Sequence, residues 1–146
     1  MTRFLCDAML GKLARYLRMC GYDTAYALDR GVETDAAVGD LARRENRTLL
    51  TRDADLAART AGAIRLTARD IEAQLRELRA AGVSLSLPET PRRCGRCNGA
   101  LTRIEPTTET PEDAPTPSET PVWRCEECGG YFWKGSHWDD VRDRLP

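Results

Sequence analysis

Four aspartates follow or open apolar segments at positions where carboxylates can bind a metal ion. Asp7 ends the run RFLCD, and Asp53 and Asp55 come directly after TLLT, in the segment TRDAD. Asp35 lies at the start of the amphipathic segment that precedes TLLT. In a parallel sheet, ligands bind beyond the carboxyl ends of the strands, near the point where the winding direction reverses. If the first and third strands are neighbours, we expect all four carboxylates at one edge of the sheet.

Carboxylates crowded at one site repel one another and lose hydration, so such a group needs a cation. All-oxygen ligation suits Mg²⁺ or Mn²⁺. Helix capping is the alternative, because an acid in the first turn of a helix is stabilised by free N–H groups and by the helix dipole. Capping explains Asp35 and Asp53, taken singly, at least as well. It does not explain Asp7, which ends an apolar strand, and one cap does not need both Asp53 and Asp55.

Two further aspartates, Asp23 and Asp29, flank the second apolar run, TAYAL. Acids in such places are commonly turn residues, and we interpret both in this way. Of the two, Asp23 is the better candidate for an additional ligand.

A basic stripe follows the first aspartate. Lys12, Arg15 and Arg18 recur every three residues, which places them on one broad side of a helix. Arg52, within TRDAD, adds a fourth cation. A phosphate bound to a metal at the carboxylates would have these positive partners nearby. A solvated helix face is the alternative, and we give it equal weight.

Four of the six cysteines form two C-x-x-C pairs, CGRC and CEEC. They are Cys94, Cys97, Cys125 and Cys128. Two such turns can aim four thiolates at one tetrahedral Zn²⁺, and the pattern predicts a zinc ribbon. A redox C-x-x-C is the alternative, but the surrounding βαβ pattern that it needs is missing. His137, the single histidine, is not needed as a ligand because four cysteines already satisfy zinc.

A ribbon can simply stabilise a small module, since zinc supplies folding energy, or it can also bind nucleic acid. Aromatic residues crowd around the second cysteine pair: Trp123, Tyr131, Phe132, Trp133 and Trp138. Exposed rings would stack on bases. In a module this small, we expect most of the rings to form its core.

Short apolar runs alternate with amphipathic segments through the first part of the chain. The expected strands are 3–7, 24–28, 48–51 and 63–66, and the expected helices are 9–20, 34–45, 53–61 and 70–81. Apolar residues at helical spacing predict the buried faces: Leu10, Leu13, Ala14, Leu17, Val38, Leu41, Ala42, Ile71, Leu75 and Leu78. This alternation indicates an α/β fold with a mainly parallel sheet flanked by helices.

The character of the chain changes at PETPRR, residues 88–93, which we interpret as a linker. We therefore expect an α/β domain at 1–87 and a zinc ribbon at 88–146. Within the ribbon, residues 105–121 hold five prolines, five acids and no cation, which predicts a disordered inserted loop. The last segment, 137–145, predicts a short helix.

Composition and missing residue types exclude several classes. The net charge of −1 leaves room only for a local nucleic-acid surface. No apolar run approaches the roughly 20 residues of a membrane span, and no signal peptide is recognisable, so we expect a soluble cytoplasmic protein without membrane contact. The α/β region has no histidine for a histidine-based hydrolase. A haloacid-dehalogenase-type phosphatase would need an acid where Met9 stands, and a receiver domain would need a lysine after Lys12.

Several segments together resemble a known family. They are FLCDAMLGKLARYLRMCGYDT, RTLLTRDADL, CNGAL and CEECGGYFWKGSHW. In this order they resemble the PIN-like ribonuclease domain of the "Mut-seven C-terminal" type, with its zinc ribbon. The resemblance covers nearly the whole chain and departs mainly at 105–121.

The resemblance implies a PIN-like fold and a metal-dependent ribonuclease. Asp7 matches the first-strand acid of the family, Asp53 and Asp55 match the paired acids after the later strand, and Asp35 matches the acid on the intervening helix. The four paired cysteines match the ribbon ligands. The family assigns no role to His137.

We therefore predict an endoribonuclease that cleaves RNA at an aspartate-bound Mg²⁺ or Mn²⁺. Asp7 and Asp53 would hold the metal, Asp35 and Asp55 would complete the site or orient water, and the four cations would position the RNA backbone. The zinc would be structural. The alternative is a non-catalytic RNA- or ribosome-binding protein that kept the fold. The sequence does not specify a protein partner or a homodimer.

Overall fold

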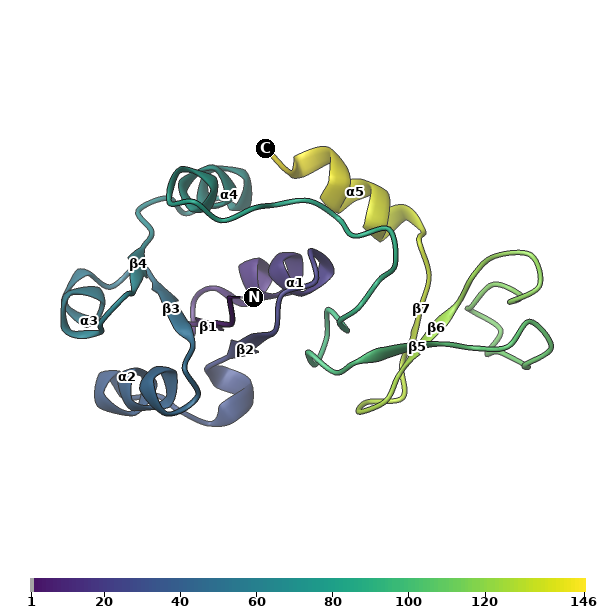
Figure 1. Cartoon of the computed structure of the whole chain (residues 1–146), viewed down its shortest axis with the longest axis horizontal. Helices are drawn as coiled ribbons and strands as arrows, with labels where there is room; N and C mark the ends of the chain where they lie inside the picture. The colour runs from purple at the N-terminus through teal and green to yellow at the C-terminus, as the bar shows by residue number, and fades with distance from the viewer. Residues whose placement is uncertain (1) are drawn as a thin grey trace.

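Four short strands form a parallel sheet in the order β2-β1-β3-β4 (Figure 1). The strands are β1 (Phe4–Cys6), β2 (Thr24–Tyr26), β3 (Thr48–Thr51) and β4 (Ile64–Arg65). The computed structural model describes residues 2–146. The predicted α/β class is confirmed, and so is the expectation that the first and third strands are neighbours, since Phe4 pairs with Thr48 in parallel register.

Helices cover both faces of this sheet. They are α1 (Gly11–Met19), α2 (Asp35–Arg44), α3 (Ala54–Arg59) and α4 (Ile71–Ala80). Helices α1 and α4 lie on one face and α2 and α3 on the other (Figure 1). Successive side chains of β1 point to opposite faces of the sheet, so each face has its own apolar core. Phe4 packs in the core with α1 and α4, and Leu5 packs in the core with α2 and α3. Every helix residue predicted to face inward is buried.

Local sequence sets where three of the helices begin. The Thr34 hydroxyl accepts the N–H of Ala37 and so caps the start of α2. Asp53 caps α3 and Asp70 caps α4 in the same way. These side chains satisfy N–H groups that have no partner within the helix. The second strand is shorter than predicted, because Leu28–Arg30 forms a 3-10 turn, η1.

The order of the strands defines the edge at which a ligand would bind. From β1 the chain passes through α1 to β2 on one side, and from β3 it passes through α3 to β4 on the other. The winding direction therefore reverses between β1 and β3. Crevices in open α/β sheets form beyond the carboxyl ends of the strands at such a point. Asp7 and Asp53 are the first acids beyond those two strand ends.

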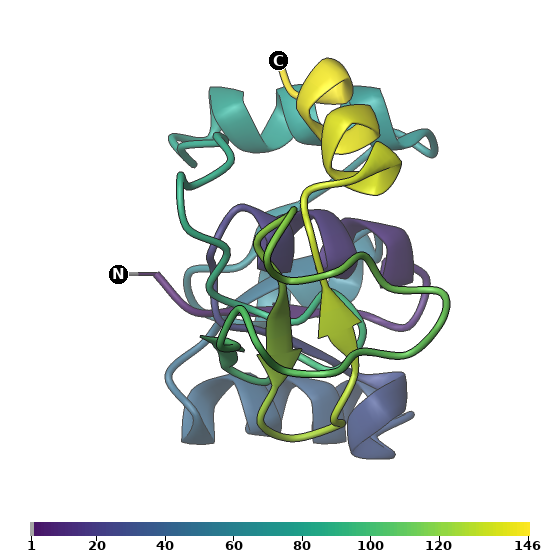
Figure 2. The same ribbon diagram turned by 90° about the vertical axis from the view of Figure 1, so that its right-hand side faces the viewer.

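The C-terminal part is a three-stranded antiparallel sheet and a helix. Strands β5 (Leu101–Arg103), β6 (Trp123–Cys125) and β7 (Tyr131–Phe132) pair in chain order, and α5 (Ser136–Arg144) follows. Figure 2 looks onto these strands, with α5 above them. Trp138 and Val141 of α5 are buried in the same core as α1 and α4. The ribbon is thus fastened to the first sheet by its last helix.

Residues 105–121, expected to be a disordered loop, contain neither helix nor strand in the structure. They run as a succession of turns closed by backbone hydrogen bonds, such as Ala114 N–H to Pro111 O. In Figure 1 this segment, in green, extends from the ribbon on the side away from the parallel sheet. Across residues 2–146, no helix has the length and apolar character needed to cross a membrane.

Candidate functional site

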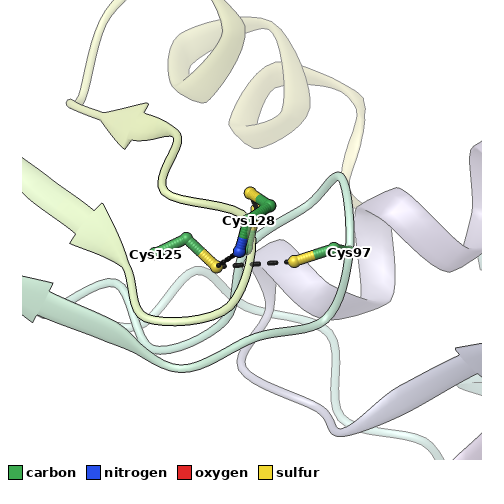
Figure 3. Close-up of side chains that lie close together, drawn as sticks. Cys97, Cys125 and Cys128 are labelled. Carbon is green, nitrogen blue, oxygen red and sulfur yellow. Dashed lines mark hydrogen bonds between the residues drawn. The ribbon is translucent and has the colours of Figure 1, made fainter.

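The four paired cysteines converge on one point between the two C-x-x-C turns. Their sulfur atoms all lie within 4.8 Å of one another. Cys94 Sγ lies 3.8 Å from Cys128 Sγ. Cys97 Sγ lies 3.4 Å from Cys125 Sγ, and Figure 3 shows this pair with Cys128. Tetrahedral zinc with Zn–S bonds of about 2.3 Å holds its sulfurs about 3.8 Å apart. The donor set therefore fits a structural zinc ion.

Backbone N–H groups donate hydrogen bonds to two of these sulfur atoms. Gly99 N–H donates to Cys97 Sγ, and the N–H groups of Glu127 and Cys128 donate to Cys125 Sγ. Burial opposes ionisation of the Cys125 thiol, but the N–H groups of Cys128 and Glu127 outweigh it and bring the pKa of Cys125 to about 7. Thiolate is the form that binds zinc, so the second turn favours the ligand state at Cys125, whereas burial raises the pKa of Cys97 to about 12.

At the carboxyl edge of the parallel sheet, Thr51 joins Asp7 to Asp53. The Thr51 hydroxyl donates to Asp7 Oδ2 at 2.7 Å and accepts the N–H of Asp53 at 3.0 Å. Asp7 Oδ1 accepts the N–H of Ala8 at 2.8 Å. Thr51 is fully buried, so its hydroxyl is committed to these two bonds. The sequence reasoning missed Thr51, whose only signal is its place as the last residue of β3.

Asp53 does cap a helix, as the alternative interpretation proposed. Its Oδ1 accepts the N–H groups of both Asp55 and Leu56. Its Oδ2 accepts no hydrogen bond from residues 2–146. Capping therefore uses one oxygen of Asp53 and leaves the other for a ligand. The Asp55 carboxylate is exposed in the first turn of the same helix.

Asp35 lies farther from this pair. It stands in the first turn of α2, its side chain is 47 % exposed, and it forms an ion pair with Arg59 at 3.3 Å. Among the described residues, the cysteines are the only group of three or more candidate ligands whose donor atoms lie within 4.8 Å of one another. The four aspartates are not gathered that tightly.

The four predicted cations have different surroundings. Lys12 and Arg15 are exposed on α1. Arg18 is only 4 % exposed, and its guanidinium donates to the carbonyls of Thr24 and Gly95. Arg18 is therefore unavailable to a phosphate, because a buried guanidinium needs its hydrogen bonds where they are.

Arg52 lies beside the aspartate pair. Its Nη1 approaches Met9 Sδ at 3.9 Å. Within residues 2–146, Arg52 Nε is the only buried side-chain nitrogen or oxygen that lacks a hydrogen-bond partner. Buried donors are nearly always paired, so this nitrogen is an exception.

Asp23 belongs to a different part of the molecule. It precedes β2, at the amino edge of the sheet, where it forms ion pairs with Arg47 at 2.8 Å and with Arg3 at 3.2 Å. The Asn98 amide also donates to it, at 2.7 Å. Burial opposes ionisation, but the bonds from Asn98 and Arg47 outweigh it and hold the pKa of Asp23 well below its usual range. The suggestion that Asp23 joins the acidic site is wrong.

Comparison with known proteins gives one family and no individual relative. No curated protein and no solved structure matches the chain. The profile of one family, described as the Mut7-C RNAse domain, matches residues 2–145, which include both the parallel sheet and the cysteine ribbon. That description names a ribonuclease, with RNA as its substrate. The chain belongs to the Mut7-C RNAse domain family.

Proposed function

We propose that this protein is a metal-dependent endoribonuclease that cleaves RNA at the carboxyl edge of a PIN-like sheet. The observation that carries the proposal is the Asp7–Thr51–Asp53 arrangement. It brings carboxylates from two neighbouring strands to the point where the winding reverses, in a chain whose family is named for a ribonuclease. Oxygen ligands of this kind suit Mg²⁺ or Mn²⁺.

In this proposal, Asp7 and Asp53 bind the ion directly; Thr51 orients the Asp7 carboxylate and holds the backbone from which Asp53 extends. A bound Mg²⁺ or Mn²⁺ supplies Lewis acidity toward a phosphate oxygen and lowers the pKa of a water ligand. Asp55 is exposed and free to orient water. Asp35 takes part only if its carboxylate exchanges Arg59 for the site.

The cations near the edge give RNA its positive partners. Arg52 directly precedes Asp53 and is partly exposed, so its guanidinium is placed to bind a phosphate oxygen there. Lys12 and Arg15 extend this surface along α1. Arg18 no longer belongs to the proposed contacts. The zinc site has no open ligand position when four cysteines bind it, which suits a structural ion.

The test is incubation of labelled RNA with purified protein, with and without added Mn²⁺ or Mg²⁺. We expect metal-dependent cleavage that falls at least about 100-fold in Asp7→Asn and in Asp53→Asn, because metal stabilisation is worth several kcal/mol. Asn caps helices as well as Asp does, so Asp53→Asn keeps α3. The matched control is Asp70→Asn, the same change at the cap of α4, which should cleave normally.

Two results would contradict the proposal. Unchanged cleavage in both aspartate variants would mean that the site is elsewhere. RNA binding without metal-dependent cleavage would favour the alternative of a non-catalytic RNA- or ribosome-binding protein.

A further inference from the structure

A cleft of about 300 Å³ lies where α1, the first cysteine turn, β7 and α5 meet. Lys12 and Arg15 line it from α1, Arg96 from the cysteine turn, and Tyr131 and His137 from the C-terminal part. Neither the family description nor the proposed metal site assigns a role to this cleft.

The two sides of the cleft differ in chemistry. Lys12, Arg15 and Arg96 are exposed cations, and Asp140 is the only acid that lines the cleft. The rings of Tyr131 and of its neighbours supply flat apolar surface. A combination of cations and aromatic rings suits a nucleotide, because bases stack on rings while phosphates bind the cations. A volume near 300 Å³ is at the lower end for ligand pockets, which suits one nucleotide.

The position of the cleft connects it with the aspartate pair. Helix α1 begins directly beyond Asp7, whose carbonyl accepts the N–H of Leu10. Lys12 lies in the first turn of α1 and Arg15 one turn farther on, about 4.5 Å along the helix axis. An RNA strand bound at Asp7 can therefore continue along α1 into the cleft.

Close packing and hydrogen bonds hold the walls of this cleft together. Gly95 allows close approach, since a Cβ there would lie 3.2 Å from Arg15 Cγ. Arg18, buried beneath, donates to the carbonyls of Gly95 and Arg96 and so holds the cysteine turn against α1. The zinc ligands Cys94 and Cys128 also line the cleft, so the ribbon forms one of its walls.

We propose that this cleft binds the base of one unpaired nucleotide of the RNA substrate, with Lys12, Arg15 and Arg96 on the flanking phosphates. This inference rests on the proposed function, because it places a substrate subsite next to the cleavage site. It gives the ribbon a role in substrate choice: a strand with an accessible base enters the cleft, and a base-paired one does not.

The test measures RNA binding separately from cleavage. The protein carries Asp7→Asn, no Mg²⁺ or Mn²⁺ is added, and no chelator is used, so that zinc remains. The probes are a fluorescently labelled single-stranded RNA tetranucleotide and an abasic strand of equal length and charge. We expect the RNA to bind at least tenfold more tightly than the abasic strand.

Variants then separate the two sides of the cleft. Arg15→Ala should weaken both probes about tenfold. Tyr131→Ala and His137→Ala should reduce the advantage of RNA over the abasic strand. The matched control for lost charge is Arg79→Ala, since Arg79 is exposed in the last turn of α4, away from the cleft. Zinc content reports whether each variant keeps its ribbon, and His137, which is exposed, tests the base side without touching the core.

Equal binding of the two probes would overturn the base pocket and leave a phosphate-binding surface only. Equal effects of Arg15→Ala and Arg79→Ala would overturn the cleft altogether. Because the probes are read in protein that cannot cleave, these outcomes are distinct from a failure of the ribonuclease proposal. Loss of cleavage in Asp7→Asn together with equal probe binding would support the metal site and reject the base pocket.

Discussion

Thr51 connects the two aspartates through a single buried hydroxyl. In Thr51→Val the size is kept and both hydrogen bonds are lost, so Asp7 and the Asp53 N–H lose a partner. We expect unfolding free energy to fall by about 1–3 kcal/mol, with a larger relative loss of RNA cleavage as the carboxylates lose their alignment. Denaturant unfolding and cleavage rates measure the two effects.

Thr51→Ser is the control for this prediction, because it keeps the hydroxyl and removes only a methyl group. It should retain most of the cleavage that Thr51→Val loses. If both variants cleave equally, Thr51 contributes packing and does not orient the aspartates.

At the scale of single residues, the sequence predicted only some of the residues in the candidate site. Asp7 and Asp53 were identifiable because acids are conspicuous after apolar strands. Thr51 was not, because a threonine at the end of a strand is an ordinary β residue. Arg18 was misleading, since its spacing placed it with Lys12 and Arg15. Its burial depends on a turn that docks from 77 residues along the chain.

At the scale of the element, Gly99 determines whether the ribbon can form its zinc site. A Cβ at Gly99 would lie 2.6 Å from Cys125 Sγ and 2.8 Å from the Glu127 side chain. Gly99→Ala should therefore displace a ligand, lower zinc content well below one per chain and lower the thermal stability of the ribbon.

Gly39→Ala is the comparison for this change. Gly39 lies within α2, and a Cβ there would meet only Thr60 Oγ1, at 3.4 Å. It should keep full zinc and be neutral or stabilising, since alanine favours helix by about 1 kcal/mol over glycine. Full zinc occupancy in Gly99→Ala would show that the turn can widen.

The order of helices and strands was the part of the fold that the sequence predicted best. Apolar spacing predicted the order of strands and helices, and capping by Asp53 was the alternative that the sequence offered at the start of α3. The second strand was overextended, because the 3-10 turn at Leu28–Arg30 interrupts an apolar pattern. The cysteine spacing predicted a compact ligand cluster, since four thiolates in two turns have few other arrangements.

At the scale of the whole molecule, one network of charges joins the amino edge of the sheet to the ribbon. Asp23 pairs with Arg47, which is 4 % exposed, and with Arg93 and the Asn98 amide from the ribbon segment. Glu45 pairs with Arg47 and Arg30, and hydrogen bonds from Arg30 hold the pKa of Glu45 at about 2. Sequence alone could not find this network, because its members are far apart along the chain.

This network predicts how stability depends on pH. The folded pKa of Asp23 lies below the unfolded value, so its stabilisation is present above about pH 4 and is lost as pH falls toward the folded pKa. Asp23→Asn should cost about 2 kcal/mol at pH 7, because Arg47 loses a charged partner, and about 1 kcal/mol less at pH 3.

Urea unfolding of both proteins at the two pH values measures this difference. Acid also weakens zinc binding, but it does so in both proteins and cancels in the comparison. A stability difference that is the same at pH 3 and pH 7 would mean that Asp23 contributes through hydrogen bonding alone.

The burial of α5 against α1 and α4 has a consequence for biosynthesis. Trp138 and Val141 complete a core whose other members are made more than 50 residues earlier. Because the ribosome delivers the chain from its N-terminus, the apolar face of α1 and α4 stays uncovered until α5 emerges. The core on the α1 and α4 face of the sheet that carries the aspartates is thus completed only once α5 has been made, and until then its apolar side chains are accessible to chaperones.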